Sequence, residues 1–260
     1  TAVRLARRGY AVRVFEANAI AGGKATKIEQ DGFFWGFGPS LFTLPELLDE
    51  LFALCGRDAT QYYRYKRIDP VCKYFYEDGT RLQAHAQPEA FAEELQQKTG
   101  EPARNVLRHL KKIAADYEAT KRIFLYSSLH KAATYFNLRA LKTMTHLPQL
   151  GMTNTMHRAN QHQFKDERVV QLFNRYATYN GSDPYLAPAT LNVIAHLEYN
   201  MGAYFLEGGM PDLSAALYKL AIELGVQFHF NTKVERIFAE DNVATGVVAN
   251  GNFYASDVVV

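Results

Sequence analysis

The first sixteen residues have the pattern of a short helix, a glycine and a strand that ends on a carboxylate. Three apolar residues fall on one side of the expected helix: Val3, Leu5 and Ala6. Gly9 stands where helices commonly end in a left-handed conformation, and the segment AVRVFE then alternates as a strand does, ending at Glu16. In dinucleotide-binding βαβ units an acidic residue at that place bonds ribose hydroxyls. Many α/β proteins share the pattern, so a plain α/β unit stays open beside nucleotide binding.

The glycine-rich phosphate loop of such a unit precedes the helix, which would place it before Thr1. We therefore expect that the chain begins inside the motif. The last residues, ASDVVV, have the pattern of a strand that rejoins the nucleotide-binding sheet. On this interpretation the sequence is a piece of a longer protein, truncated at both ends, and the piece alone is inactive.

A first glycine turn follows Glu16 in the segment EANAIAGGKA, where Gly22 and Gly23 precede Lys24. Paired glycines let backbone amides approach an anion, and the lysine adds positive charge. For an isolated GGK the alternative is an ordinary turn with a solvated lysine. Here the turn stands a few residues after the carboxylate, which favours an anion site.

A second turn lies in DGFFWGFGPSLFTLP, where Gly38 and Pro39 separate two aromatic runs. Ser40 offers a hydroxyl and a backbone amide next to that turn. We expect most of the surrounding aromatic side chains to be ordinary core: Phe33, Phe34, Trp35, Phe37 and Phe42.

The order VFEAN, GGKA, GFGPSLFTLP, followed late in the chain by AYFLEGGMPDLSAALYKLAIELGVQFHFNTKVERI, resembles the FAD-dependent carotenoid desaturases. These form the phytoene desaturase family within the amine-oxidase-like flavoproteins. The resemblance covers residues 1–260 and is strongest at 1–48 and 200–260. Between them, VVQLFNRYATYNGSDPYLAPAT is similar to a helix of the family's substrate domain and the loop after it.

The resemblance implies FAD as the cofactor and assigns it a set of binding residues. Glu16 would bond the adenosine ribose, Gly22, Gly23 and Lys24 would lie along the diphosphate, Gly38, Pro39 and Ser40 would approach the flavin, and the backbone of Val234 would lie against the adenine. The GGM segment at 208–210 would return the chain towards the flavin. Two positions depart from the family pattern: Lys24 stands for an arginine, and Gly36 stands for an aspartate.

The resemblance implies an α/β fold: an FAD-binding Rossmann-like domain, truncated at both ends, with an inserted, largely helical substrate- and membrane-binding domain. The FAD-binding domain would comprise residues 1–60 and 201–260, and the substrate domain residues 61–200. Local patterns predict helices at 45–58 and 211–225, a hairpin within 62–86 with its turn at EDGT, mostly helix at 88–176, and short strands over 226–260.

The implied activity is FAD-dependent desaturation of a carotenoid precursor, such as phytoene or a hydroxycarotenoid, by hydride transfer to the flavin. The partner would be a lipophilic polyene, and no catalytic residue can be nominated. One alternative is a flavin amine oxidase or a protoporphyrinogen-oxidase-like enzyme. A nicotinamide-dependent Rossmann dehydrogenase would explain Glu16 without the two glycine turns, and a non-enzymatic membrane-binding scaffold would explain basic helices alone.

Composition narrows these possibilities. The formal net charge is +2 with 22% charged residues, which argues against nucleic acid as a partner. The two cysteines, Cys55 and Cys72, are not in a CxxC spacing, so we expect both to be buried and inert in a reducing compartment, the cytoplasm. His157 and His162 are five residues apart, on different faces of a helix, and we expect no metal site.

Residues 101–146 suggest contact with a membrane surface. They hold nine basic residues against three acidic ones: Arg104, Arg108, Lys111, Lys112, Lys121, Arg122, Lys131, Arg139 and Lys142 against Glu101, Asp116 and Glu118. Aromatic and aliphatic residues are interleaved: Ile123, Phe124, Leu125, Tyr126, Leu129, Tyr135, Phe136, Leu138 and Leu141. Such helices bind membrane interfaces, and we expect peripheral attachment. The alternative is a solvated basic face on a helix whose apolar side is core.

Overall fold

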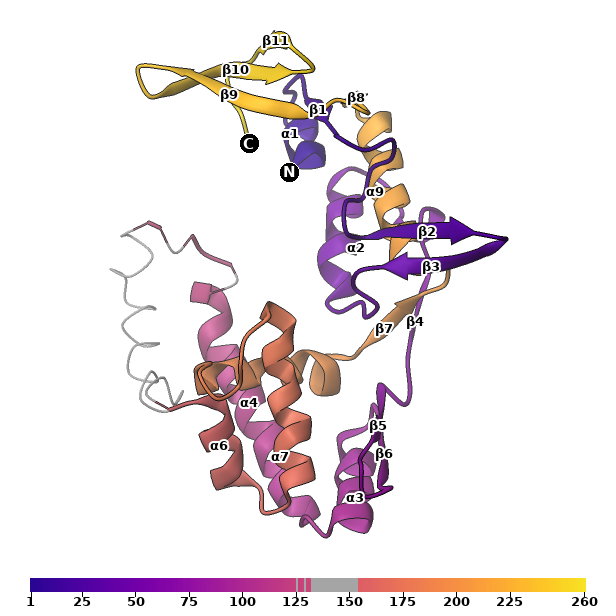
Figure 1. Ribbon diagram of the computed structural model, residues 1–260, viewed down its shortest axis with the longest axis vertical. Helices are drawn as coiled ribbons and strands as arrows, with labels where there is room; N and C mark the ends of the chain where they lie inside the picture. The colour runs from indigo at the N-terminus through magenta and orange to yellow at the C-terminus, as the bar shows by residue number, and fades with distance from the viewer. Residues whose placement is uncertain (125, 129, 132–153) are drawn as a thin grey trace. The chain divides into compact units, whose positions relative to one another are not determined.

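The computed structural model describes residues 1–124, 126–128, 130–131 and 154–260 (Figure 1). These residues form two compact units. Unit 1 comprises Thr1–Lys66 and Tyr204–Val260, and unit 2 comprises Arg67–Ala203. The expected domain boundaries lie after residues 60 and 200, whereas the units divide after Lys66 and Ala203. Residues 61–66 belong to unit 1, where β4 pairs with β7, and residues 201–203 belong to unit 2.

Unit 1 is a mixed α/β unit built from both ends of the described chain. Its elements are α1 (Ala2–Arg7), β1 (Arg13–Phe15), β2 (Thr26–Gln30), β3 (Phe33–Phe37), α2 (Pro45–Leu54), the short 3₁₀ helix η1 (Ala59–Gln61), β4 (Tyr65–Arg67), β7 (Tyr204–Leu206), α9 (Met210–Glu223), β8 (Gln227–His229), β9 (Val234–Glu240), β10 (Val243–Ala249) and β11 (Asn252–Ala255).

The predicted helix, glycine and strand at the start of unit 1 are confirmed. Helix α1 ends at Arg7, and Gly9 has a φ of 89°, a left-handed conformation that glycine adopts without strain. Its amide donates to the Ala6 carbonyl at 2.9 Å. Strand β1 then pairs in parallel with β8, with Val14 opposite Phe228.

Two antiparallel assemblies complete unit 1. Strands β2 and β3 form a hairpin, and β9, β10 and β11 form a three-stranded meander in the order β11-β10-β9. The short strands predicted over 226–260 are present, and the segments EDN and ANGN form the turns between β9, β10 and β11. The expected strand at the end of the chain is wrong, since β11 ends at Ala255 and residues 256–260 are not in a strand.

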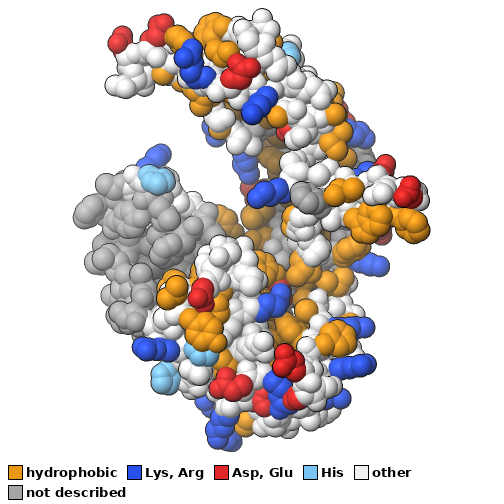
Figure 2. All heavy atoms as spheres, in the orientation of Figure 1, with side chains coloured by type: hydrophobic (Ala, Val, Ile, Leu, Met, Phe, Trp, Pro, Cys, Tyr) orange, Lys and Arg blue, Asp and Glu red, His pale blue; other side chains and the backbone are white. Residues whose placement is uncertain are grey.

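The β2–β3 hairpin extends beyond the core of unit 1. Ile28, Phe33, Phe34 and Trp35 are each at least half exposed, and Figure 2 shows hydrophobic side chains at the hairpin's tip, at the right of the view. The expectation that these aromatic side chains are core is therefore wrong for Phe33, Phe34 and Trp35, whereas Phe42 is buried. The hairpin is a sheet of two strands, with no third strand beside it in the described part of the chain.

The core of unit 1 lies between its helices and the strands β1, β7 and β8. The fully packed side chains come from both ends of the chain: Val3, Phe42, Phe52, Cys55, Tyr63, Leu206, Ala216, Leu220, Ala221 and Val226. Pro45 begins α2, as predicted, because proline fits the first turn of a helix where no amide donor is needed. These contacts hold the first and last segments of the described chain in one unit.

Unit 2 is mainly helical. It contains the hairpin β5 (Cys72–Phe75) and β6 (Arg81–Ala84), then α3 (Pro88–Thr99), α4 (Ala103–Phe124), α6 (Met156–Gln163), α7 (Glu167–Asn174), the 3₁₀ helices η4 (Arg175–Asn180) and η5 (Ala189–Asn192), α8 (Val193–His196) and the π-helical turn η6 (Leu197–Met201). The hairpin confirms the EDGT turn, where the Thr80 amide donates to Asp78 at 2.9 Å. The core of unit 2 includes Phe91, Leu95, Leu110, Phe173 and Tyr199.

Two sequence expectations in residues 62–86 need correction. The strand β4 pairs with β7 rather than joining the β5–β6 hairpin, and this pairing connects segments far apart in the sequence. Cys72 is half-buried rather than buried because it lies on a hairpin strand with alternating exposure, whereas Cys55 is buried in unit 1.

Candidate functional site

The carboxylate of Glu16 lies at the carboxyl end of the parallel strands β1 and β8, the edge where α/β sheets bind ligands. The Glu16 amide donates to the His229 carbonyl at 2.9 Å, and the Thr232 amide donates to the Glu16 carbonyl at 2.8 Å. Its side-chain Oε1 accepts from the amide and the side-chain Nδ2 of Asn18, both at 2.8 Å. Oε2 accepts no hydrogen bond from any residue that the structure describes.

Val234 follows the segment that is hydrogen-bonded to Glu16, because that segment leads directly into β9. Val234 is the first residue of β9, two residues after Thr232, and its register partner is Ala249. Val234 is 37% exposed. Sequence reasoning named both residues, and it missed Asn18, which orients the carboxylate.

The two glycine turns flank one hairpin. The first precedes strand β2 and the second follows strand β3, so they meet at the base of the hairpin. Strand β2 begins at Thr26, directly after the GGKA segment, and β3 ends at Phe37, directly before Gly38. Thr26 pairs with Phe37, which closes the base. A Cβ added to Gly38 would stand 2.0 Å from the Lys24 carbonyl oxygen, so the two turns touch through their backbones.

The backbone of the first turn presents open donors. Gly22 and Gly23 have φ values of 129° and 53°, and the Ala25 amide donates to the Gly22 carbonyl at 2.8 Å. No described residue accepts a hydrogen bond from the amide of Gly23 or Lys24. Nothing lies within 4 Å of where a Cβ of Gly23 would stand, and Lys24 is exposed. Two adjacent amides and an ammonium group therefore face solvent at this turn.

The second turn is held in place by the buried side chain that follows it. Phe42 exchanges two backbone hydrogen bonds with Tyr204, at 3.0 and 2.8 Å, and its ring contacts Tyr65 edge-to-face at 5.5 Å. Tyr63 and Tyr65 donate to the two oxygens of Asp49, each at 2.7 Å. Burial and the bond to Asp49 raise the pKa of Tyr65 to about 12, so its hydroxyl stays protonated and keeps donating.

Gly36, which stands where the family pattern has an aspartate, lies in β3 opposite Lys27. No atom lies within 4 Å of where its Cβ would be, so the missing carboxylate is not a consequence of crowding. The exposed residues Pro39 and Ser40 follow Gly38, and no contact of theirs bears on a flavin.

The segment GGM begins helix α9. Gly209 has a φ of 79°, and a Cβ on Gly208 would stand 2.1 Å from the Asp212 carboxylate. The next turn of the helix brings Ser214 to the first glycine turn, where its Oγ donates to the Ala25 carbonyl at 2.8 Å. Sequence reasoning missed Ser214. The sequence carries one local signal of this contact. Ser214 begins a run of small residues, SAA, and small side chains let a neighbour approach a helix closely.

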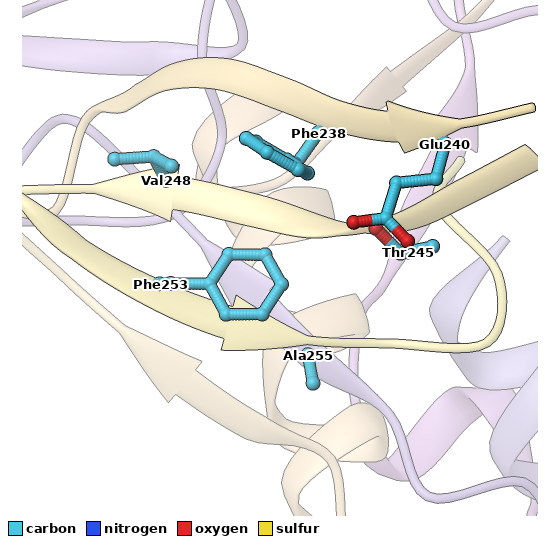
Figure 3. A pocket seen from close by; sticks show the side chains of 6 residues that line it. All are labelled: Phe238, Glu240, Thr245, Val248, Phe253 and Ala255. Carbon is cyan, nitrogen blue, oxygen red and sulfur yellow. The ribbon is translucent and has the colours of Figure 1, made fainter.

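A separate pocket of about 500 Å³ lies on one face of the β9–β11 meander (Figure 3). Figure 3 shows Phe238, Val248 and Phe253 towards one side of it, with the oxygens of Glu240 and Thr245 together at the other. None of the predicted site residues lines this pocket. It is therefore distinct from the glycine turns.

In unit 2 a buried carboxylate collects three donors. Glu198, in the π-helical turn η6, is fully buried and accepts from Arg175 at 2.8 Å, from Tyr176 at 2.7 Å and from Tyr179. Burial raises the pKa of Tyr176 well above its ordinary value, which keeps its hydroxyl a donor. Tyr199 is buried nearby. The three donors lie in the NRYATYN segment, and sequence reasoning did not single out the cluster.

The basic stretch is only partly described. In helix α4 the apolar side chains Val106, Leu110 and Ile113 are core, while Arg104, Arg108 and Lys111 are exposed. Two lysines pair within the helix: Lys112 with Asp116 and Lys121 with Glu118. Of the interleaved apolar residues, Tyr126 is 57% exposed, and Leu125, Leu129, Tyr135, Phe136, Leu138 and Leu141 lie outside the described residues.

Neither a membrane span nor a metal cluster occurs in the described part of the chain. None of its helices has both the length and the apolar character that crossing a bilayer requires. No group of three or more His, Cys, Asp or Glu side chains there is placed to hold a metal ion. The Nδ1 atom of His157 instead accepts a hydrogen bond from Nδ2 of Asn174 at 2.9 Å, and its ring lies tilted against Tyr185.

The sequence model of the flavin-containing amine oxidoreductases matches residues 1–260. The chain belongs to this family. Its relatives include a 1-hydroxycarotenoid 3,4-desaturase from Flavobacterium sp. (strain P99-3), 42% identical over 259 residues, which cover 100% of this chain and 53% of the relative. A 4,4'-diapolycopene oxygenase from Methylomonas sp. is 28% identical over 100% of this chain and 52% of its own length. A 4,4'-diaponeurosporene oxygenase from Staphylococcus aureus (strain bovine RF122 / ET3-1) is 30% identical with the same coverage.

Solved structures of flavin-containing amine oxidoreductase type share the fold. An oxidoreductase from Methanosarcina mazei superposes with a TM-score of 0.57 and 16% identity, over 99% of this chain and 54% of that one. Putrescine oxidase bound to putrescine gives a TM-score of 0.59 and 17% identity, over 96% and 52%. The chain thus spans about half the length of the proteins it matches.

Membership of the flavin-containing amine oxidoreductases implies a flavin cofactor, and the residues present fit one. A dinucleotide needs an acceptor for ribose hydroxyls and donors for its diphosphate. Glu16 has an unused carboxylate oxygen, and Gly23 and Lys24 present two unused amides with an exposed ammonium beside them. Gly22 and Gly38 have conformations that favour glycine, and Ser214 and the Lys24 carbonyl occupy the space where their Cβ atoms would stand, so both glycines let the two turns pack closely.

Proposed function

We propose that the full-length protein is an FAD-dependent carotenoid desaturase acting on a hydroxycarotenoid. The 42% identity over the whole chain to a 1-hydroxycarotenoid 3,4-desaturase carries this proposal. That relative is named for removing hydrogen from a polyene that bears a hydroxyl group. Phytoene becomes the less favoured substrate, because none of the relatives described above is named for it.

The cofactor would be FAD, bound by unit 1. Glu16 would hold the ribose through Oε2, the amides of Gly23 and Lys24 would bond the diphosphate, and Gly22 would lie along it. The remaining assignments are Val234 against the adenine and Gly38, Pro39 and Ser40 towards the flavin. The meeting of the two glycine turns at one hairpin base supports a continuous site, since both would border the same extended ligand.

Unit 2 would be the substrate domain, inserted into a Rossmann-like FAD domain made of the two parts of unit 1. FAD, when bound, would supply a hydride acceptor: one saturated carbon would lose a hydride with its electron pair, the neighbouring carbon would lose a proton, and the electron pair left by that proton would form the new double bond. The residues of this chain would bind and orient the two ligands and exclude water. The aromatic core of unit 2, with Phe91, Phe173 and Tyr199, supports an apolar surrounding.

A carotenoid dissolves in bilayers, so the enzyme would collect it at a membrane surface. The exposed residues Arg104, Arg108 and Lys111 of α4 support docking to anionic lipid. Because the apolar side of α4 is buried in the core of unit 2, the helix would bind the membrane mainly by electrostatic attraction. Both cysteines are unpaired, which supports a reducing compartment such as the cytoplasm.

Expression of the full-length protein in cells that accumulate a 1-hydroxycarotenoid tests the proposal. The expected product has lost two hydrogens and absorbs at longer wavelength because its conjugation is longer. A product that has gained oxygen would instead favour an oxygenase, the activity named for two of the relatives. Unchanged carotenoid in cells that contain the flavin-loaded protein would contradict both activities.

A further inference from the structure

The loop Gly22–Ala25, which the proposed function places on the cofactor's diphosphate, is held from two sides. On one side the Lys24 carbonyl packs against Gly38, where a Cβ would come within 2.0 Å. On the other side stands Ser214 of α9, whose Oγ donates to the Ala25 carbonyl at 2.8 Å. A Cβ on Gly22 would stand 3.0 Å from the Cβ and Oγ of Ser214, so helix and loop are in close contact.

Next to this contact the loop borders a hollow rather than a packed wall. A pocket of about 360 Å³ is lined by Ala25 of the loop, by Ile20 and other residues on either side of the loop, by residues of α9 such as Tyr218, and by Phe230. Ser214 also lines this pocket, at the point where the helix reaches Ala25. The hydrogen bond of Ser214 therefore fixes a loop that side-chain packing supports only in part.

The orientation of the loop matters because its two open amides must converge on one anion. Paired glycines have unusually large conformational freedom, so an untethered GGKA loop would sample many backbone arrangements. The Ala25 carbonyl accepts from Ser214 while the Ala25 amide closes the turn on the Gly22 carbonyl at 2.8 Å. Fixing Ala25 thus fixes the end of the turn in which the amides of Gly23 and Lys24 lie.

We propose that Ser214 is a positioning residue for FAD binding: its bond to the Ala25 carbonyl holds the amides of Gly23 and Lys24 ready for the diphosphate. This inference rests on the proposed function, because it takes FAD as the ligand. It adds a residue from α9, far along the chain, that contacts the loop rather than the cofactor.

The test compares Ser214→Ala with the matched control Ser256→Ala in the full-length protein. Ser256 also donates its hydroxyl to a carbonyl, that of Val258, at 2.7 Å, but it follows β11 and has no hydrogen bond to the described loop Gly22–Ala25. FAD affinity is measured by titrating the apoprotein, and amide hydrogen exchange is followed at residues 22–25. Ser214→Ala is expected to raise the Kd for FAD about five-fold and to speed exchange at Gly23 and Lys24 in the apoprotein. The control is expected to change neither.

Each other outcome has a definite meaning. Wild-type affinity and wild-type exchange in Ser214→Ala would overturn the role of Ser214. Equal weakening by both variants would also overturn it, since the effect would then come from general destabilisation. A full-length wild-type protein that binds no FAD would overturn the proposed function itself, and the hydrogen exchange of the apoprotein would still report whether Ser214 holds the loop.

Discussion

At the scale of single residues, Glu16 shows how a local network prepares a carboxylate for one partner. Asn18 occupies Oε1 with two donors, which fixes the side chain and leaves Oε2 open. A carboxylate that is already oriented loses little conformational entropy when it binds. The Glu16 pattern was readable from the sequence, because a strand that ends on an acidic residue is a local signal. The Asn18 bonds were not, because they depend on the turn that follows.

Replacing Glu16 with alanine is expected to weaken FAD binding more than it changes the protein fold. Loss of a charge-assisted bond to the ribose costs on the order of 1.5–3 kcal/mol, or roughly 10- to 150-fold in Kd. Titration of the full-length apoprotein with FAD measures the effect. The control is Glu240→Ala, which removes a carboxylate from the separate pocket of the meander. Unaltered affinity in Glu16→Ala would show that the ribose assignment is wrong.

His109 gives unit 2 a dependence on pH. Its ring lies between Phe164 and Phe173, with centroids at 5.0 and 4.6 Å, and burial together with the charge of Lys112 lowers its pKa to about 3. The same histidine in the unfolded chain has a pKa of 6.5. Between these values the unfolded chain binds a proton that the folded chain does not. Stability is therefore full above about pH 6.5 and falls towards pH 3, by at most about 1.4 kcal/mol per pH unit.

The variant His109→Leu is expected to lose less stability than the wild type when the pH falls. Urea unfolding of the full-length protein at about pH 7.5 and about pH 5 measures this difference. Some pH dependence should remain, because burial also lowers the pKa of His196. The exposed residue His162 provides the control, as His162→Leu. Equal pH dependence in wild type and His109→Leu would contradict the neutral, buried state of this ring.

At the scale of elements, the β2–β3 hairpin explains why two motifs belong together. GGKA and GFGPS are separate in the sequence, and an antiparallel hairpin necessarily returns its second strand to the start of the first. The local patterns predicted α2, the EDGT turn and α9, since proline, glycine and alternation act over a few residues. They failed for β4, whose partner β7 lies far along the chain, and for Phe33, Phe34 and Trp35, because hydrophobicity alone does not say which hairpin face is covered.

Membrane docking can be tested with three residues of helix α4 rather than with the whole basic stretch 101–146. Arg104, Arg108 and Lys111 are exposed at spacings of four and three residues, which places them on one side of the helix. Each basic residue near an anionic surface contributes roughly 1 kcal/mol, so reversing all three to glutamate should release the full-length protein from anionic liposomes at low salt. Lys112 and Lys121 are left unchanged because they pair with Asp116 and Glu118.

Co-sedimentation with liposomes measures this effect, and bound FAD serves as the check that the fold is intact. The control reverses three other exposed basic residues of unit 2: Lys73, Arg81 and Lys98. Equal sedimentation of the α4 variant and the wild type would make this stretch a solvated basic face on a core helix.

At the scale of the whole molecule, each of the two units has a core of its own. Unit 1 gathers every residue that the sequence suggested for FAD, although these residues come from both ends of the described chain. This grouping was predicted from the resemblance to the carotenoid desaturases, because no local sequence pattern connects residues 16–40 with residue 234. The Ser214 contact and the Glu198 cluster could not be foreseen, since each depends on side chains that folding alone brings together.

The most direct test of the central claim follows flavin and polyene in one anaerobic experiment. The full-length protein, loaded with FAD, is mixed with a 1-hydroxycarotenoid in liposomes, and both absorption bands are recorded together. The account predicts that the oxidised-flavin band declines while the polyene band moves to longer wavelength, with one new double bond for each flavin reduced. A flavin band that persists with the carotenoid but disappears with an amine such as putrescine would contradict the account and identify an amine oxidase.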